Sequence, residues 1–271
     1  MLKRDISKRI HVVRNTRKPY DDMPSSHYHD GYEIYHLITG TVRYFLDSKI
    51  YDLEPGDIIL IPPDKLHKTT VTSSVPAERL LISFTADFFN KKIGDHLFRC
   101  FNNPFVSEPQ KYKDTLNKIE DEFLFKDEYT EDIVKNLISI LLVKLSRVST
   151  NNTYNSSISS LSEEIIKYIN NNYDKDISRQ TLSNEFFLSE NHISTLFKKE
   201  TGFGFNEYLN IIRIKNSEHL LITTNMSISK IAFACGFQDS NYYSSVFKKA
   251  NGVSPLKYRK INSKKKNWYF T

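Results

Sequence analysis

The first third of the chain alternates short apolar runs with polar turns. Five runs occur, at residues 32–38, 42–46, 50–53, 58–61 and 80–84. They are rich in β-branched and aromatic residues, which favour strands. Short strands separated by turns at intervals of about 8–12 residues are typical of an antiparallel sandwich or barrel. We therefore expect an antiparallel β-barrel over about residues 20–85.

From residue 112 the apolar positions recur with a helical period. Leu116, Ile119 and Phe123 share one face of a first predicted helix. A second helix is marked by Ile133, Leu137, Ile140, Leu141, Leu145 and Val148. This helical pair, over residues 112–148, packs either on the barrel or against a second copy of the chain. The pattern leaves both open.

An Asn- and Ser-rich stretch over residues 151–160 is typical of a linker. It separates a predicted N-terminal domain over residues 1–150 from an all-α domain over residues 161–262. A basic and aromatic tail follows over residues 263–271. We expect this tail to be disordered, with phosphate contacts as the alternative.

The C-terminal domain repeats itself at a fixed offset. Residues 191–199 (NHISTLFKK) reappear as residues 241–249 (NYYSSVFKK). Upstream, residues 177–183 resemble residues 228–232 once small gaps are allowed. Each copy reads as a helix, a short turn and a second helix. The sequence thus predicts two helix-turn-helix units.

The second helix of each copy divides into an apolar and a polar face. The residues expected to be buried are Ile193, Leu196, Phe197, Tyr243, Val246 and Phe247. The opposite faces carry Asn191, Ser194, Thr195 and Lys198, and then Asn241, Ser244, Ser245 and Lys248. A solvated surface rarely repeats the same polar residues, so the duplication favours a binding function.

Capping residues give the bounds of these two helices. Ser189 is a good N-cap for the first, and Asp239 or Ser240 can cap the second. Gly202 and Gly252 are expected to end them.

Residues 205–223 read as one long helix that joins the copies. Two helices on one rigid body can enter successive major grooves of DNA, about 34 Å apart.

Charge distribution adds to this interpretation. The net charge is +6 at pH 7; residues 1–160 hold 22 Lys and Arg against 22 Asp and Glu, whereas residues 161–271 hold 16 against 10. An excess of positive charge attracts a polyanion, and nucleic acid is the first candidate.

Cys100 and Cys235 are expected to be buried thiols of a reducing compartment. With no secretory signal and no apolar run of about 18 residues, we expect a cytoplasmic protein that does not span a membrane.

Residues 161–260 resemble the DNA-binding domain of the AraC/XylS family of bacterial regulators. The similarity is carried by residues 188–202, 231–249 and 252–259. One departure lies in the first unit, where Ser183 and Phe187 stand in place of the family's usual Ala and Gly. The resemblance implies that residues 112–148 form a homodimer, that double-stranded promoter DNA is bound, and that RNA polymerase is a possible further partner.

The resemblance also implies which residues read the DNA sequence. By position, they are Asn191, Ser194, Thr195, Ser240, Asn241, Ser244 and Ser245. Asn can bond an adenine through two hydrogen bonds, while Ser and Thr are adaptable donors and acceptors. The phosphate contacts are expected from Lys198, Lys199, Lys248 and Lys249. Such contacts fix the register without reading the sequence.

The N-terminal strands resemble a cupin. The first cupin pattern, H-x-H-x3-E-x6-G, is matched by His27, His29, Glu33 and Gly40. Most of the second, G-x5-P-x-G-x2-H, is matched by Gly56, Pro62 and His67. Asp64 replaces the second Gly of that pattern, and Val71 stands in place of its later Asn.

Cupin enzymes hold a metal at the positions of His27, His29, Glu33 and His67, and such donors suit Fe, Mn, Ni or Zn. AraC-type regulators generally keep these residues as sensors. We therefore favour a pocket for a small effector, lined by these four residues and more weakly by Tyr35 and His36, without a cofactor. A bound metal and a purely structural cluster are the alternatives. The resemblance suggests a carbohydrate or its derivative as effector.

The sequence thus predicts a two-domain α+β protein: a cupin-like antiparallel β-barrel with a helical pair, and an all-α domain with two helix-turn-helix units joined by a long helix. We expect a sequence-specific transcription activator controlled by its effector, and not an enzyme. The rivals are a cupin metalloenzyme with an accessory DNA-binding domain, and a regulator without effector that uses its barrel only to dimerise.

Overall fold

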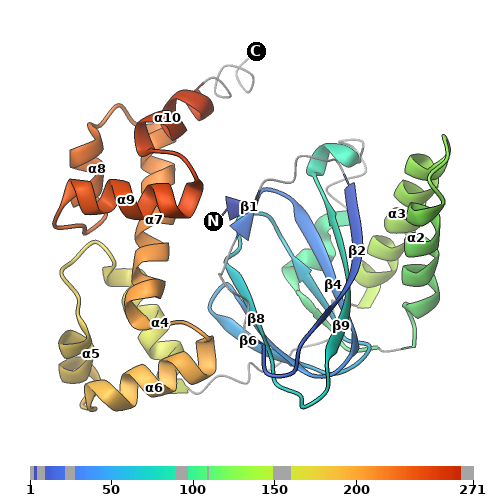
Figure 1. Ribbon diagram of the computed structural model, residues 1–271, viewed down its shortest axis with the longest axis horizontal. Helices are drawn as coiled ribbons and strands as arrows, with labels where there is room; N and C mark the ends of the chain where they lie inside the picture. Colours follow the sequence, from blue (N-terminus) through green and yellow to red (C-terminus); the bar gives the residue numbers. More distant parts are fainter. Residues whose placement is uncertain are drawn as a thin grey trace. The chain divides into compact units, whose positions relative to one another are not determined.

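The computed structural model describes residues 3–4, 10–21, 28–89, 97–108, 110–148 and 160–263. Contacts divide the chain into two compact units, one of Arg4–Ser157 and one of Ile158–Thr271 with Met1–Lys3. The first unit is rich in β-strands and the second is helical (Figure 1). Of the predicted features, His27, nearly all of the linker and residues 264–271 lie outside the described residues.

Two larger antiparallel sheets form most of the β-rich unit. The five-stranded sheet has the order β10 (Phe105–Val106), β7 (Ile58–Ile61), β4 (Tyr32–Thr39), β9 (Ala77–Phe84), β2 (Ile10–Arg17). The three-stranded sheet has the order β6 (Lys49–Leu53), β5 (Val42–Leu46), β8 (His67–Val71). Two further strands, β1 (Lys3–Arg4) and β3 (Tyr28–His29), have two residues each. The five predicted strands are confirmed, and with them an antiparallel β-rich domain.

Strands β2, β8 and β10 were not predicted. β2 begins at Ile10, before the start expected near residue 20, and lies at the edge of its sheet. Its sequence, IHVVRNTR, is only partly buried, which weakens the apolar signal of a strand. β8 has the opposite problem, because its polar sequence HKTTV is mostly buried. Neither strand shows a clean alternation of apolar and polar residues.

The two faces of β4 contribute to different apolar cores. Tyr35 and Leu37 pack with Tyr44 and Leu46 of the smaller sheet, so this core lies between the sheets. Ile34 belongs to a second core, on the opposite face of the larger sheet. This alternation follows from the two-residue period of a strand. A residue of β4 therefore faces either the smaller sheet or the helices.

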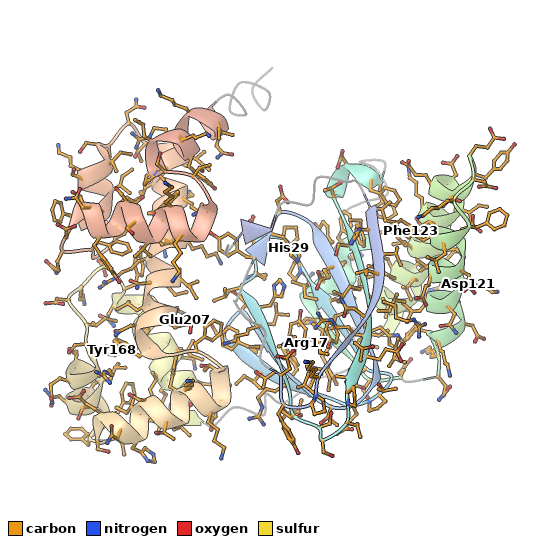
Figure 2. The ribbon with its side chains drawn as sticks, in the orientation of Figure 1. Arg17, His29, Asp121, Phe123, Tyr168 and Glu207 are labelled. Atoms are coloured by element: carbon orange, nitrogen blue, oxygen red, sulfur yellow. The ribbon has the colours of Figure 1, made fainter. Side chains whose placement is uncertain are left out.

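The helices that cover the outer face are α2 (Lys113–Phe125) and α3 (Thr130–Val148). They pack beside the sheet in Figure 1, together with the short 3-10 helices η1 (Ala86–Phe88) and η2 (Phe98–Asn102). Figure 2 shows Phe123 on the side of α2 nearer the sheet and Asp121 on the outer side. Packing of this helical pair within the chain is thus confirmed for one face.

Some of the apolar positions that mark α3 in the sequence are exposed. Ile133 and Ile140 are 40% and 49% exposed. The buried residues are Val134, Ile138, Leu141, Leu142 and Leu145. Apolar residues occur on most sides of this helix, so the helical period alone did not determine which side faces the sheet.

The helical unit contains α4 (Ser160–Asn172), α5 (Arg179–Phe186), α6 (Glu190–Thr201), α7 (Phe205–Thr223), α8 (Ile228–Ala234), α9 (Ser240–Asn251) and α10 (Pro255–Ser263). The long helix predicted over residues 205–223 is confirmed by α7. Ser160, at the end of the predicted linker, is already the first residue of α4. No helix among the described residues is long and apolar enough to cross a bilayer. Cys100 and Cys235 are free and buried, as expected.

His36 lies on the outer face of β4, two residues after Ile34, and is only 7% exposed. Burial lowers the pKa of its imidazole to about 4, and the positive charges of Arg14 and Lys113 act in the same direction. The folded protein therefore holds His36 neutral at pH values where an unfolded chain would protonate it.

This burial predicts a loss of stability in acid. Between the unfolded pKa of about 6.5 and the folded pKa of about 4, the unfolded state binds one more proton at His36, so the free energy of unfolding falls as the pH falls. At about 1.4 kcal/mol per pKa unit, the contribution is up to about 3 kcal/mol. Urea unfolding of the wild type should show this fall in the free energy of unfolding between pH 7 and pH 4. The fall should be smaller in His36→Gln. The exposed His192 provides the control, His192→Gln; an equal change in both variants would contradict the assignment.

Candidate DNA-reading helices and ligand site

The second helices of the two repeats, α6 and α9, have the same pattern of burial. In residues 191–199 and residues 241–249 each position has the same class of exposure as its counterpart. Ile193, Phe197, Tyr243 and Phe247 are buried, as predicted. Leu196 and Val246 are only half-buried, so the predicted apolar faces are correct at two of three positions each.

The ends of α6 and α9 are fixed in the same way. The side chain of Ser189 accepts a hydrogen bond from the N–H of His192, and that of Asp239 accepts one from the N–H of Tyr242. Asp239, not Ser240, is therefore the cap of α9. Gly202 and Gly252 end the helices at φ values of 75° and 74°, in the left-handed region that favours glycine.

The outer faces of α6 and α9 carry fewer serines than predicted. Asn191, Thr195, Asn241 and Ser245 are exposed, and so are Lys198, Lys199, Lys248 and Lys249. Ser194, Ser240 and Ser244 are half-buried. The Ser244 hydroxyl donates a hydrogen bond of 2.9 Å to the carbonyl oxygen of Ser240, which turns it toward its own helix.

Two exposed residues beside the asparagines were missed. His192 and Tyr242 occupy equivalent positions and are both exposed. The Tyr242 hydroxyl accepts a hydrogen bond of 3.1 Å from the side-chain amide of Asn210 in α7. The repeat makes positions 192 and 242 equivalent. Because one is His and the other Tyr, the sequence did not show that both belong to the exposed face.

The first helices of the repeats, α5 and α8, correct the predicted alignment. Ser178 caps α5 and Ser227 caps α8, each accepting a hydrogen bond from the N–H three residues later. Ile177 therefore corresponds to Met226, not to Ile228. The spacing between Ser178 and Ser189 is one residue shorter than that between Ser227 and Asp239, which obscured the alignment.

The turn after α5 departs from the turn after α8. Phe187 takes a left-handed φ of 54° and its side chain is 92% exposed. The Ser183 hydroxyl closes this turn by donating a 2.6 Å hydrogen bond to the carbonyl oxygen of Leu188. The equivalent Gly236 has a φ of 84°, and a Cβ there would lie 2.4 Å from the carbonyl oxygen of Tyr173. Both turns have the same handedness, but only the second is packed against other backbone.

Arg213, near the middle of α7, contacts both repeats. Its Nε donates a 2.7 Å hydrogen bond to the carbonyl oxygen of Tyr173, and a terminal nitrogen donates one of 2.8 Å to that of Lys175. Its guanidinium also lies 5.6 Å from the ring centre of Phe237. The segment before α5 is thereby tied to the turn before α9. Sequence periodicity gave no sign of this residue, because it sits in a helix among apolar neighbours.

In the β-rich unit, His29, Glu33 and His67 come together between the two sheets. All three are buried, and their potential ligand atoms lie within 4.8 Å of one another. His29 Nε2 is 3.5 Å from Glu33 Oε2, and the Ser83 hydroxyl donates a 3.3 Å hydrogen bond to the same oxygen. Figure 2 shows His29 among the strands of this unit. His27, the fourth predicted member, lies outside the described residues.

Backbone carbonyls orient both imidazoles. His29 Nδ1 donates to the carbonyl oxygen of Gly31 at 2.7 Å, and His67 Nδ1 donates to that of Lys65 at 2.9 Å. A carbonyl can only accept, so in the neutral rings the proton is on Nδ1 and the lone pair on Nε2. Metal-binding histidines are usually held in this way. Two imidazoles and a carboxylate so arranged fit a transition-metal ion, and equally the hydroxyl groups of a small polar ligand.

The cupin-like turns support this cluster. Asp64, which replaces the usual Gly, has a left-handed φ of 60°, a conformation that Asp tolerates better than most residues. Its N–H donates a 2.8 Å hydrogen bond to the carbonyl oxygen of His29. The substitution therefore preserves the turn that holds His29 in place.

Of the two weaker candidates, Tyr35 lies near the cluster and His36 does not. Tyr35 faces the smaller sheet, with its ring centre 5.0 Å from that of Tyr44. Burial raises the pKa of both phenols, which keeps them neutral donors. His36 is on the other face of β4, so its assignment to the pocket is wrong. Adjacent residues of a strand cannot share a face.

Comparisons with known proteins fit both halves of the chain. Residues 182–261 match a family described as helix-turn-helix domain, and residues 12–117 match one described as AraC-like ligand binding domain. The HTH-type transcriptional activator RhaR of Escherichia coli (strain K12) is 23% identical over 255 residues, 90% of each chain. The HTH-type transcriptional regulator YijO of the same strain is 39% identical over 100 residues, 37% of this chain and 35% of that protein. A solved structure of ToxT from Vibrio cholerae matches 94% of this chain and 100% of its own, with 19% identity and a TM-score of 0.42.

The two turns predict opposite effects of small substitutions. Phe187→Gly should raise the free energy of unfolding by up to about 1 kcal/mol, because it relieves a left-handed residue without removing a buried contact. Gly236→Ala should lower it by about 2 kcal/mol or more, because the new methyl group meets backbone atoms. Calorimetric unfolding of the full chain measures both. Phe187→Ala is the control, since it removes the ring but keeps the Cβ; a gain equal to that of Phe187→Gly would contradict the strain argument.

Proposed function

This chain belongs to the AraC/XylS family of transcription regulators, and from that premise we propose that it activates promoters in response to a small effector. It is a DNA-binding regulator with a ligand-binding domain, and not an enzyme, which removes the metalloenzyme rival. Activation is supported by RhaR, which is named an activator and aligns with 90% of this chain.

DNA recognition is proposed to come from α6 and α9 together. The observation that carries it is the duplicated exposed face on two identically capped helices. Asn191, Thr195, Asn241 and Ser245 would meet base edges in successive major grooves. Ser194, Ser240 and Ser244 belong to the same surface but are half-buried, so their contribution is smaller. Lys198, Lys199, Lys248 and Lys249 would neutralise phosphates.

The effector is proposed to bind between the two sheets, which would enclose it as a cupin-like barrel. Support comes from His29, Glu33 and His67, three polar groups buried beside the apolar core between the sheets. Their partners, which are one another, Ser83 and two backbone carbonyls, hold them in one fixed arrangement, and a few convergent polar groups of this kind favour a binding role. Tyr35 would add a hydroxyl donor. The proposed ligand is a small polar molecule such as a carbohydrate or its derivative, and a divalent metal ion is the second candidate because the donor distances and the orientation of both imidazoles suit one.

A homodimer through α2 and α3 is also proposed. Ile133, Ile140 and Val143 expose apolar surface along α3, and Leu124 and Phe125 do so at the end of α2. Ile133 and Ile140 are seven residues apart, so they lie on one side of the helix. A second copy would cover this surface. Sedimentation of the full chain at micromolar concentration tests the pairing, and a monomer there would count against it.

The reading faces predict distinct effects on DNA binding. On a duplex that the wild type selects from a random pool, Asn191→Ala and Asn241→Ala should each cost about 1–3 kcal/mol, because a base contact is lost. Lys198→Ala should weaken specific and non-specific duplexes alike and make the salt dependence shallower. Fluorescence anisotropy over a range of salt concentrations separates the two effects. Asn171→Ala, an exposed asparagine in α4, is the control; unchanged affinity in the double asparagine variant would show that the faces are wrongly assigned.

The proposed ligand site predicts the metal content of the purified protein and its stabilisation by sugars. We expect less than stoichiometric metal by elemental analysis, and a rise in the melting temperature with at least one member of a panel of monosaccharides and sugar phosphates. His67→Gln should abolish that rise, because it removes an imidazole of the cluster. One equivalent of Fe, Mn, Ni or Zn, lost in His67→Ala, would instead identify the metal ion as the ligand.

A further inference from the structure

The β-rich unit contains a cavity of about 620 Å³ that is distinct from the buried histidine cluster. It is bounded by the start of β4, the turn between β5 and β6, and η2. Its size is that of many small-molecule sites, which span about 300–1,000 Å³. His29, Glu33 and His67 are not part of its lining.

Neighbouring residues of β4 face the cavity and the histidine cluster. Tyr32 lines the cavity and belongs to the core under the helices. Glu33, the next residue, lies on the other face of the strand, where its carboxylate is close to the imidazole of His29. Successive side chains of a strand point to opposite faces. Leu46 and Tyr51 extend the lining to the core between the sheets, but His29, Glu33 and His67 themselves are not part of it.

One wall of the cavity is aromatic. The ring of Tyr32 is stacked on that of Phe98, with centres 4.1 Å apart and planes at 5°, and Phe101 meets Tyr32 edge-on at 4.7 Å. Tyr51 lines the cavity from β6. Tyr32 and Phe98 are half-buried, so part of the ring surface is accessible. Flat aromatic surfaces favour a flat apolar ring as partner.

The polar part of the lining is cationic. It contains Lys49, Lys65 and Arg99 against one carboxylate, Asp47. Lys65 is paired with Asp47. Lys49 and Arg99 are exposed, and within the described part of the chain neither has an ion-pair partner. Two exposed cations that line one cavity attract an anion, and guanidinium in particular bonds a carboxylate through two parallel hydrogen bonds.

From this combination we propose that the cavity is a second ligand site, which takes an aromatic carboxylate. The rings would stack against Tyr32 and Phe98, and the carboxylate would face Arg99 and Lys49. A neutral sugar is less suited, because the lining offers cations and only one carboxylate, already paired. The cavity shares no residue with the histidine cluster, so the effector proposed above would occupy a separate site.

The test uses 1-naphthoate as the probe and the full chain in isothermal titration calorimetry. We expect one equivalent to bind, and 1-naphthalenemethanol, which lacks the charge, to bind at least about tenfold more weakly. Arg99→Gln and Lys49→Gln should each raise the Kd by about five- to tenfold. Both residues are exposed, so neither change should impair folding, and unfolding curves verify this.

Two control variants separate the possible failures. Lys118→Gln removes an exposed lysine of α2 that does not line the cavity and should leave the Kd unchanged. His67→Gln should also leave naphthoate binding unchanged, even if it abolishes the response to the effector. Absence of binding to the wild type, equal affinity for the alcohol, or equal affinity in Arg99→Gln would overturn the proposal.

Discussion

The contact between Arg213 and the backbone before α5 determines how the helical unit can work. One guanidinium bonds two carbonyl oxygens of the first repeat and lies over Phe237 of the second. A long helix alone would fix the distance between α6 and α9 but not the rotation of one repeat relative to the other. A side chain that holds both repeats also constrains that rotation. The relative orientation of α6 and α9 thus depends on both α7 and Arg213.

The repeat was the most informative part of the sequence, because it compares the chain with itself. It predicted α6 and α9, with a cap at Ser189 and another at Asp239 or Ser240, since local hydrogen bonds decide where helices begin. It could not predict that Ser194 and Ser244 are half-buried. Their positions on the helical wheel are at the margin of the polar face, where neighbouring helices decide exposure. Residues such as Arg213, which act across repeats, have no local signal.

The β-rich unit was harder to predict, for a different physical reason. The motif positions brought His29, Glu33 and His67 together correctly, because a strand and two turns define them. The face of His36 was missed, although the two-residue period of a strand separates it from Tyr35. The aromatic cavity combines β4, the β5–β6 turn and η2, which are far apart in the sequence. No local pattern reports a site of that kind.

The two turns differ in how much room surrounds them. At Gly236 the backbone of Tyr173 and Asp174 leaves no space for a side chain, whereas Phe187 projects almost wholly into solvent. Position 187 is therefore a suitable attachment point for a fluorescent dye or a spin label. A reporter placed there would sit shortly before α6 in the chain and would report changes in the surroundings of the first repeat in real time.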